Sequence, residues 1–478
     1  MAPSFNPIRS GFIFVGSALA SLGLIDRHRV VRATDLSWPR VVTGIARMSK
    51  SAADVAMVGL AVGPVAIAGI GFALPYWGFA FAIGGGIAGA SIALVSQRFG
   101  AEQWDELALA VRTSAVLALA ITIPIAVLLA TVPDFLIGLL SSDEPAVVEG
   151  ANYLRVIAFG IPFAALNLVG SRVLVGCDDA WIPMVIRGGG AVVNIVLNAV
   201  FIFGLGLGVA GAALGTVVAN VMVSVTFAIG LSRGHLPLIG QFPVRVPPLG
   251  RYVELEMLRD AIEIGTPLMF TNLARTSSSF PKFLLLGMLG PNVVAAYVIA
   301  MRVRGLMGTP GWGFSLASSS LVGQELGIGD EGEAEAWAND ILRFAIAIYL
   351  IVSASVFVSA EQVGRLFVDD PSILPLVTVF IYAACISVIF NGVDGASTGP
   401  LRASGDTRWP FYAQLTGRYV VALPLLYLGI ATPLGVSAVY GVIIADMLVP
   451  AAIVYYRFRT GTWKSISREY RPEGTPSH

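Results

Sequence analysis

Long apolar segments alternate with short polar ones along almost the whole chain. An apolar run of about 18 residues or more is long enough to cross a bilayer as an α-helix. The pattern predicts an all-α membrane protein with twelve spans. In the first half the predicted spans are 38–61, 65–95, 108–131, 150–176, 181–204 and 209–231, and in the second half they are 262–288, 292–322, 338–360, 372–401, 411–431 and 434–456.

The composition supports membrane insertion and argues against several other classes. Of the 478 residues, 56% are hydrophobic and 13% are charged, and the formal net charge is zero, whereas soluble proteins carry about 25% charged residues. No nucleic-acid partner is expected. Two cysteines inside apolar runs and three histidines outside them offer no metal-ligand spacing, nucleophile–base pair or cofactor motif. We therefore do not expect an enzyme.

Arginine and lysine are concentrated in three segments that we expect to be cytoplasmic. These are an amino-terminal segment (1–37), a connector (232–260) and a carboxy-terminal tail (458–478). Since positive charge favours the cytoplasmic side, both termini are predicted to be cytoplasmic, in the plasma membrane. The apolar run 11–25 is too short to span comfortably and lacks a cleavage site, so we expect an amphipathic helix on the membrane surface.

The two halves of the chain repeat each other. Gln97 lies in Leu-Val-Ser-Gln-Arg-Phe-Gly and Gln324 in Leu-Val-Gly-Gln-Glu-Leu-Gly, an offset of 227 (324 − 97). Gly63-Pro64 recurs at Gly290-Pro291 with the same offset. Six spans in each half predict two lobes, 38–231 and 261–457, related by a pseudo-two-fold axis along the membrane normal. Parallel repeats of this kind build transporters.

Glycines and prolines fall at a similar depth in both halves. Gly84, Gly85 and Gly86 leave the second span without side chains at three consecutive positions, and Gly308 and Pro310 interrupt the eighth span. The pattern predicts two bending helices, with close helix packing as the alternative.

Three charged residues share one face of the first span. Arg47, Lys50 and Asp54 are spaced by three and four residues. Charges at membrane depth usually face protein or water. Arg47 either faces the interior or snorkels to the cytoplasm. Lys50 and Asp54 either pair with each other or serve a functional site.

Oxygen-bearing side chains accompany Asp54 in the other spans of the first half. Asn194 and Asn198 are one turn apart, Thr216 lies in the sixth span and Asn167 in the fourth. Hard cations such as Na⁺ choose carboxylate and amide oxygens, and a carboxylate in an apolar setting can carry a proton. The set predicts a Na⁺ or H⁺ site, with ordinary interhelical hydrogen bonding as the alternative.

The second half does not copy this set. At the repeat offset of 227, the positions equivalent to Asn194 and Asn198 are Val421 and Leu425. Arg275 and Lys282 instead share one face of the seventh span. We expect positive charge to line this part of the substrate path.

Several segments together resemble the multidrug and toxic compound extrusion (MATE) transporters. They are residues 54–60, 92–100, 194–204, 208–213 and 400–410, and the resemblance covers residues 38–457. It implies two six-helix lobes in a V around a central cleft, and antiport of organic compounds against Na⁺ or H⁺.

The resemblance also implies roles for single residues. The family's first-lobe cation site matches Asp54, Asn194 and Thr216, while its usual second carboxylate is Asn198 here. Some members of the family have an acidic residue at the position of Arg275 in this chain. Their second acidic position aligns nearest Asn391, and Asp394 lies one helical turn further along.

The leading hypothesis is thus a cation-coupled antiporter that works as a monomer and exports small organic compounds. Basic residues in the cleft (Arg47, Lys50, Arg275 and Lys282, beside Asp394) favour anionic or zwitterionic substrates. The alternative is a flippase for lipids or lipid-linked oligosaccharides, because a basic cleft also suits phosphate headgroups.

Overall fold

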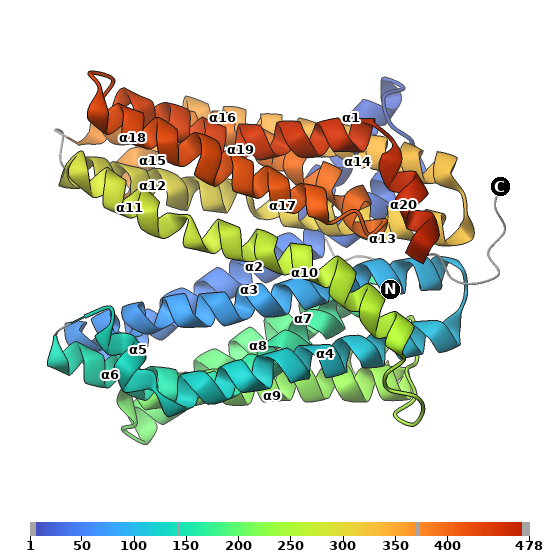
Figure 1. Cartoon of the computed structure of the whole chain (residues 1–478), viewed down its shortest axis with the longest axis horizontal. Helices are drawn as coiled ribbons and strands as arrows, with labels where there is room; N and C mark the ends of the chain where they lie inside the picture. The colour runs from blue at the N-terminus through green and yellow to red at the C-terminus, as the bar shows by residue number, and fades with distance from the viewer. Residues whose placement is uncertain (1–5, 142, 369–372, 471–478) are drawn as a thin grey trace. The chain divides into compact units, whose positions relative to one another are not determined.

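The computed structural model describes residues 6–141, 143–368 and 373–470, and within these ranges the chain is built almost wholly of helices (Figure 1). Its strands are the two-residue β1 (His235–Leu236) and β2 (Gly240–Gln241), which pair antiparallel. The chain divides into two compact units. The N-unit is Val42–Asn272, and the C-unit joins Met1–Val41 to Leu273–His478.

The N-unit holds the helices of the first half. They are most of α2 (Arg27–Ala61), then α3 (Pro64–Gly100), α4 (Trp104–Thr131), α5 (Pro133–Gly138), α6 (Glu144–Ile157), η1 (Ala158–Gly160), α7 (Ile161–Gly176), α8 (Trp181–Ala199), the π-helical η2 (Val200–Gly204) and α9 (Gly208–Arg233). Helix α3 packs against α4, α6 and α7, and α8 packs against α9. The last pair carries the candidate site.

The C-unit holds the helices of the second half. They follow α10 (Leu255–Ser277), which begins in the N-unit, and are α11 (Ser279–Met288), α12 (Pro291–Met307), α13 (Thr309–Ile328), α14 (Glu331–Val358), α15 (Ala360–Arg365), α16 (Leu374–Ala403), α17 (Arg408–Leu415), the π-helical η3 (Thr416–Ala422), α18 (Leu423–Ala431), α19 (Ser437–Arg459) and α20 (Thr462–Tyr470). Helix α16 is central and contacts α12, α13, α14 and α19.

The two units do not follow the repeat boundary, because α1 (Pro7–Ser21) and the start of α2 belong to the C-unit. Phe12 of α1 stacks on Phe314 and meets the edge of Phe344. A Cβ on Gly16 would lie 2.2 Å from Val30, so α1 packs closely on α2. The predicted surface helix thus forms and covers protein. Its contact with a membrane, and the repeat-based lobe ranges, stay predictions.

Nine helices within the described ranges are long and apolar enough to span a membrane. The other three predicted spans differ in local structure. Span 38–61 lies in α2, whose charged residues lower its hydropathy. Span 262–288 is broken between α10 and α11 at Ser278, and span 292–322 between α12 and α13 at Gly308.

The glycine predictions therefore have two outcomes. The interruption of the eighth predicted span at Gly308 is confirmed. Helix α3 instead continues through Gly84, Gly85 and Gly86. A Cβ on Gly86 would lie 2.5 Å from the backbone nitrogen of Met269, so this glycine serves close packing of α3 on α10.

The repeat is also visible in the backbone. Gly63 and Gly290 have φ values of 105° and 108°, a region that side chains with a Cβ rarely adopt. Each precedes a proline at the first position of a helix, Pro64 of α3 and Pro291 of α12. Proline is favoured there because its fixed φ suits the helix and its missing N–H is not needed. The matched dipeptides therefore start equivalent helices.

Candidate functional site

The charged face of α2 contains an ion pair. Lys50 Nζ donates to Asp54 Oδ2 at 2.9 Å. The two side chains are 24% and 18% exposed, so the pair is mostly withdrawn from solvent. Of the alternatives left open by the sequence, direct pairing across one helical turn is what the structure contains.

Helices α8 and α9 bring three predicted residues to this carboxylate. Asn198 Nδ2 donates to Asp54 Oδ1 at 2.7 Å, and Asn194 Nδ2 donates to Thr216 Oγ1 at 3.1 Å. Lys50 Nζ lies 3.5 Å from the same Thr216 oxygen. Both asparagines are fully buried. Four of the five residues predicted from sequence to form a cation site are thus neighbours, and we call Asp54, Asn194, Asn198 and Thr216 the Asp54 cluster.

One atom in the Asp54 cluster is unsatisfied. Asn198 Oδ1 is buried and has no hydrogen-bond partner among the described residues. A buried amide oxygen normally has a partner. The Asn198 side chain thus donates to Asp54 through Nδ2, while its acceptor Oδ1 stays available for a further partner.

Gly215 determines how closely α9 approaches this asparagine. A Cβ at position 215 would lie 1.9 Å from Asn198 Oδ1. Any larger residue would displace the Asn198 side chain or separate the two helices. Gly215 is therefore part of the construction of the site, although it contributes no polar side chain.

Asn167 belongs to a neighbouring hydrogen-bond group. Its Nδ2 donates to the Asn220 side-chain and backbone oxygens at 3.0 and 3.2 Å. Its Oδ1 accepts from Ser224 Oγ at 2.7 Å. These bonds join α7 to α9, as expected for interhelical hydrogen bonding, and a cation-binding role for Asn167 stays a prediction.

A cavity of about 450 Å³ within the N-unit adjoins the Asp54 cluster. Its charged lining consists of Arg47, Lys50 and Arg187 against the single carboxylate of Asp54. Trp77, Phe81 and Tyr153 add aromatic surface, and Asn167, Thr216 and Asn220 add polar groups. The volume falls within the range typical of small-molecule sites.

Sequence reasoning missed Arg187 in this lining. Its Nη1 is buried and has no partner among the described side chains. Arg187 precedes Asn194 by seven residues and so shares its face of α8. That spacing is the signal that would have found it.

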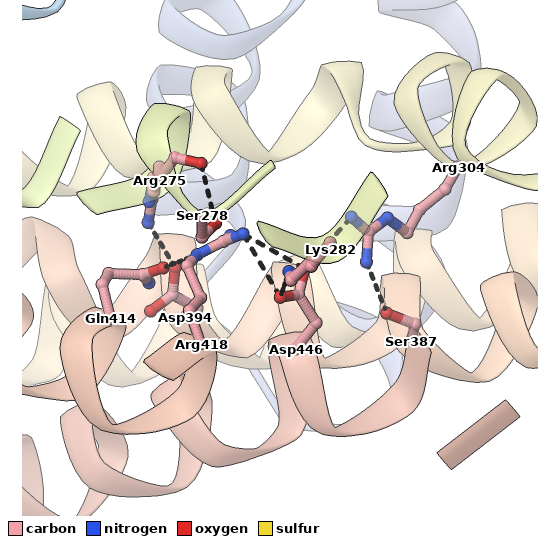
Figure 2. Close-up of polar contacts among 9 residues, drawn as sticks. All are labelled: Arg275, Ser278, Lys282, Arg304, Ser387, Asp394, Gln414, Arg418 and Asp446. Atoms are coloured by element: carbon pink, nitrogen blue, oxygen red, sulfur yellow. Dashed lines mark hydrogen bonds and ion pairs between the residues drawn. The ribbon is translucent and has the colours of Figure 1, made fainter. Parts of the chain in front are cut away.

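The C-unit contains a second carboxylate surrounded by cations, on α19 (Figure 2). Asp446 accepts from Lys282, from Arg304 Nη2 at 3.3 Å and from Arg418 Nη1 at 3.2 Å. The side chains of Asp446, Lys282 and Arg418 are only 3%, 4% and 8% exposed. We call Asp446, Lys282, Arg304 and Arg418 the Asp446 cluster. It ties α19 to α11, α12 and η3.

Other polar groups complete this region. Arg418 Nε donates to Gln414 Oε1 at 3.0 Å, and Arg304 Nη1 donates to Ser387 Oγ at 3.3 Å (Figure 2). Arg275 Nη2 donates to Asp394 Oδ2 at 3.0 Å, with side chains 35% and 4% exposed.

The predicted cleft residues of the second half are therefore engaged in ion pairs. Lys282 and Asp394 are buried, while Arg275 keeps substantial exposure. Substrate contact stays a prediction for all three. The sequence analysis assigns no role to Asp446 or Arg418, and a lone carboxylate in the apolar segment 437–459 is the signal that would have found Asp446.

Within the described ranges, no group of three or more histidine, cysteine, aspartate or glutamate residues could hold a metal ion. Any ion at the Asp54 cluster would depend on one carboxylate with neutral oxygens. Such a ligand set suits a monovalent cation better than a tightly held divalent one.

The sequence profile of the MatE family matches residues 39–200 and 267–428. The chain belongs to the MatE family. The two matched segments start 228 residues apart (267 − 39), in agreement with the repeat. This protein is accordingly a multi-pass membrane protein of a transporter family whose members are not enzymes.

Relatives cover most of this MatE protein. It is 26% identical to the probable multidrug resistance protein NorM of Photorhabdus laumondii, in an alignment that covers 81% of this chain and 85% of NorM. It is 24% identical to the multidrug export protein MepA of Staphylococcus aureus, in an alignment that covers 68% of this chain and 72% of MepA.

Solved structures agree on the fold. An outward-facing MATE transporter of the MOP superfamily matches with a TM-score of 0.83 at 22% identity, covering 91% of this chain and 96% of its own. A MOP superfamily transporter from Pyrococcus furiosus, described by the words "reverse polarity of binding pocket suggests different function", matches with a TM-score of 0.81 at 23% identity, covering 91% and 96%. The predicted all-α transporter fold is confirmed.

Proposed function

We propose that this MatE protein exports small organic compounds by antiport against Na⁺ or H⁺. The observation that carries the proposal is the Asp54 cluster, where one carboxylate, two buried asparagines and a threonine meet beside a cavity. An ion that binds one conformation better than another shifts the balance between them. Alternating access converts that shift into outward movement of substrate. The names of NorM and MepA support a small organic substrate.

Efflux from proteoliposomes under separately imposed Na⁺ and H⁺ gradients tests the coupling. Asp54→Asn is expected to abolish gradient-driven efflux, because it removes the carboxylate of the site. Asp134→Asn is the matched control, since Asp134 is 66% exposed and pairs with Arg155 at 2.6 Å. Coupled efflux that persists in Asp54→Asn would refute the proposal.

The charge of the cavity favours anionic or zwitterionic substrates. Arg47, Lys50 and Arg187 outnumber Asp54 in its lining, and a bound organic cation would be repelled by the excess. We expect an anionic dye to be exported in preference to a quaternary ammonium dye, and Arg187→Gln to reduce that preference. The reverse order of export in the unaltered protein would refute it.

The same basic lining also favours a phosphate headgroup, so lipid or lipid-linked oligosaccharide flipping is the second candidate. Scrambling of a fluorescent phospholipid in the same vesicles separates the two. Flipping without dye efflux would support the second candidate over the first.

In this proposal the protein is a monomer in the plasma membrane, with lobes 38–231 and 261–457 and both termini cytoplasmic. The basic amino-terminal, connector and tail segments support the orientation. Labelling of single cysteines introduced at positions 27 and 464 in intact cells tests it. Rapid labelling by an impermeant reagent would place those segments outside.

A further inference from the structure

The ammonium group of Lys50 lies against two oxygens of the Asp54 cluster. It is 2.9 Å from Asp54 Oδ2 and 3.5 Å from Thr216 Oγ1. An ammonium is a compact positive charge that interacts with oxygens on any side. The carboxylate therefore already has a counter-ion, and that counter-ion is covalently attached to the protein.

We propose that Lys50 is a tethered cation that competes with the transported ion, so that the ion binds Asp54 only by displacing the ammonium group. This inference rests on the proposed ion-coupled function and adds to it the residue that sets ion affinity. The motif resemblance concerns Asp54, Asn194 and Thr216, whereas the role of Lys50 is argued from its distances to Asp54 and Thr216.

The surroundings provide room for the displaced side chain. Lys50 itself lines the cavity of about 450 Å³, together with Arg47 and Arg187. A long lysine side chain can swing into this space, but there it approaches two other cations. Displacement therefore has a Coulomb cost, and that cost weakens the apparent affinity for the incoming ion.

Asn198 supplies the complementary change. In the Lys50-bound arrangement its Nδ2 donates to Asp54, and its buried Oδ1 has no partner among the described residues. Rotation of the amide would exchange the two atoms. The arriving cation would then find oxygens from Asp54, Asn198, Asn194 and Thr216. In that arrangement Asn198 Oδ1, which is buried and has no partner among the described residues, would gain the cation as its partner.

The consequence is that Asp54 is neutralised whether or not an ion is bound. An unpaired carboxylate in an apolar setting is costly, and the lysine removes that cost from the ion-free state. Removing Lys50 should make the protein bind Na⁺ more tightly and depend on the ion more strictly.

Equilibrium binding of ²²Na⁺ to the purified full-length protein tests the competition. We expect Lys50→Met to bind Na⁺ at least about tenfold more tightly than the unaltered protein, which corresponds to about 1.4 kcal/mol. Lys50→Arg retains a tethered cation and should stay close to the unaltered protein. Lys50→Met/Asp54→Asn should bind none. Equal affinity in Lys50→Met and the unaltered protein, loss of binding in Lys50→Met, or no binding by either protein would overturn the inference.

A second measurement needs no variant. The chain has three lysines, at positions 50, 282 and 464. Na⁺ should increase acetylation of Lys50 by an amine-reactive ester, read by mass spectrometry against N-methylglucamine at equal ionic strength. The buried Lys282 and the Lys464 near the carboxy terminus serve as internal references. Unchanged or reduced acetylation of Lys50 would contradict displacement.

The two proposals fail in different ways. Coupled efflux that survives Asp54→Asn removes the proposed function. Efflux that is lost in Asp54→Asn, together with unchanged Na⁺ affinity in Lys50→Met, leaves the function standing and removes only the role of Lys50.

Discussion

Asp54 and Asp446 are two lysine-paired carboxylates in one chain, and their surroundings differ in ways that indicate different tasks. Asp54 accepts from one ammonium group and one neutral amide beside a cavity, and its side chain is 18% exposed. Asp446 meets three cations and its side chain is 3% exposed. A carboxylate with one counter-ion and nearby space can exchange that counter-ion. A carboxylate that pairs with cations from three helices cannot lose these partners unless the helices separate.

Neutralising Asp446 is expected to have the largest effect. Asp446→Asn leaves Lys282, Arg304 and Arg418 without their shared partner. Removing one member of a buried ion pair costs about 3–5 kcal/mol. We expect a large fall in Tm, measured by thermal unfolding in detergent, and poor accumulation in the membrane.

The matched variant Asp54→Asn sharpens this contrast. It leaves one lysine that can swing into the adjoining cavity, so the loss of stability should be much smaller. Equal destabilisation by the two variants would show that both carboxylates are structural, and the proposed difference in task would be wrong.

The sequence predicted one of these clusters and missed the other for a physical reason. Asp54 and Lys50 are neighbours on one helix, and Asn194 and Asn198 are one turn apart, so their spacing is readable. The partners of Asp446 come from α11, α12 and η3, so only tertiary packing brings them together.

The helices show the same division between local and tertiary information. Apolar length identified the long helices, because the bilayer sets that length. The glycines at 84, 85 and 86 do not interrupt α3, and the close approach of Gly86 to Met269 is a tertiary contact that the sequence pattern does not reveal. Gly215 was missed because glycine is common in membrane helices, and only the approach of Asn198 reveals its importance.

Gly215→Ala tests whether the close approach of α9 to α8 positions the ion site. The added Cβ would lie 1.9 Å from Asn198 Oδ1, and overpacking of this kind costs about 1–3 kcal/mol. We expect both a lower Tm and weaker Na⁺ binding, read by unfolding and by ²²Na⁺ binding.

Two other glycines provide controls for this substitution. Gly417→Ala in the C-unit would place a Cβ 2.5 Å from Pro450 Cδ and should lower Tm without changing Na⁺ affinity. Gly189→Ala, with no atom within 4 Å, should change neither. Loss of Na⁺ affinity in Gly417→Ala would mean that any loosening of the fold weakens the site.

Asn198→Asp adds a second carboxylate to the Asp54 cluster. Lys50 can neutralise one of the two, which leaves the other for the ion. We expect Na⁺ to bind about tenfold more tightly, a gain of about 1.4 kcal/mol. The binding assay with ²²Na⁺ measures it. Unchanged affinity would show that Asn198 does not face the bound ion.

The smallest expected effects separate the two clusters by kind of readout. Ser387→Ala removes one acceptor of Arg304, at 3.3 Å, and Arg304 keeps Asp446 and partial exposure. A single net hydrogen bond is worth about 1 kcal/mol, so Tm should fall slightly and efflux should not change.

Thr216→Val keeps the shape of a side chain that accepts from Asn194 and lies near Lys50. Its Tm should also fall slightly, but Na⁺ affinity should fall with it, because Thr216 Oγ1 is one of the proposed oxygens. If both variants change only Tm, Thr216 is a packing residue and the ion is held by Asp54 and the asparagines alone.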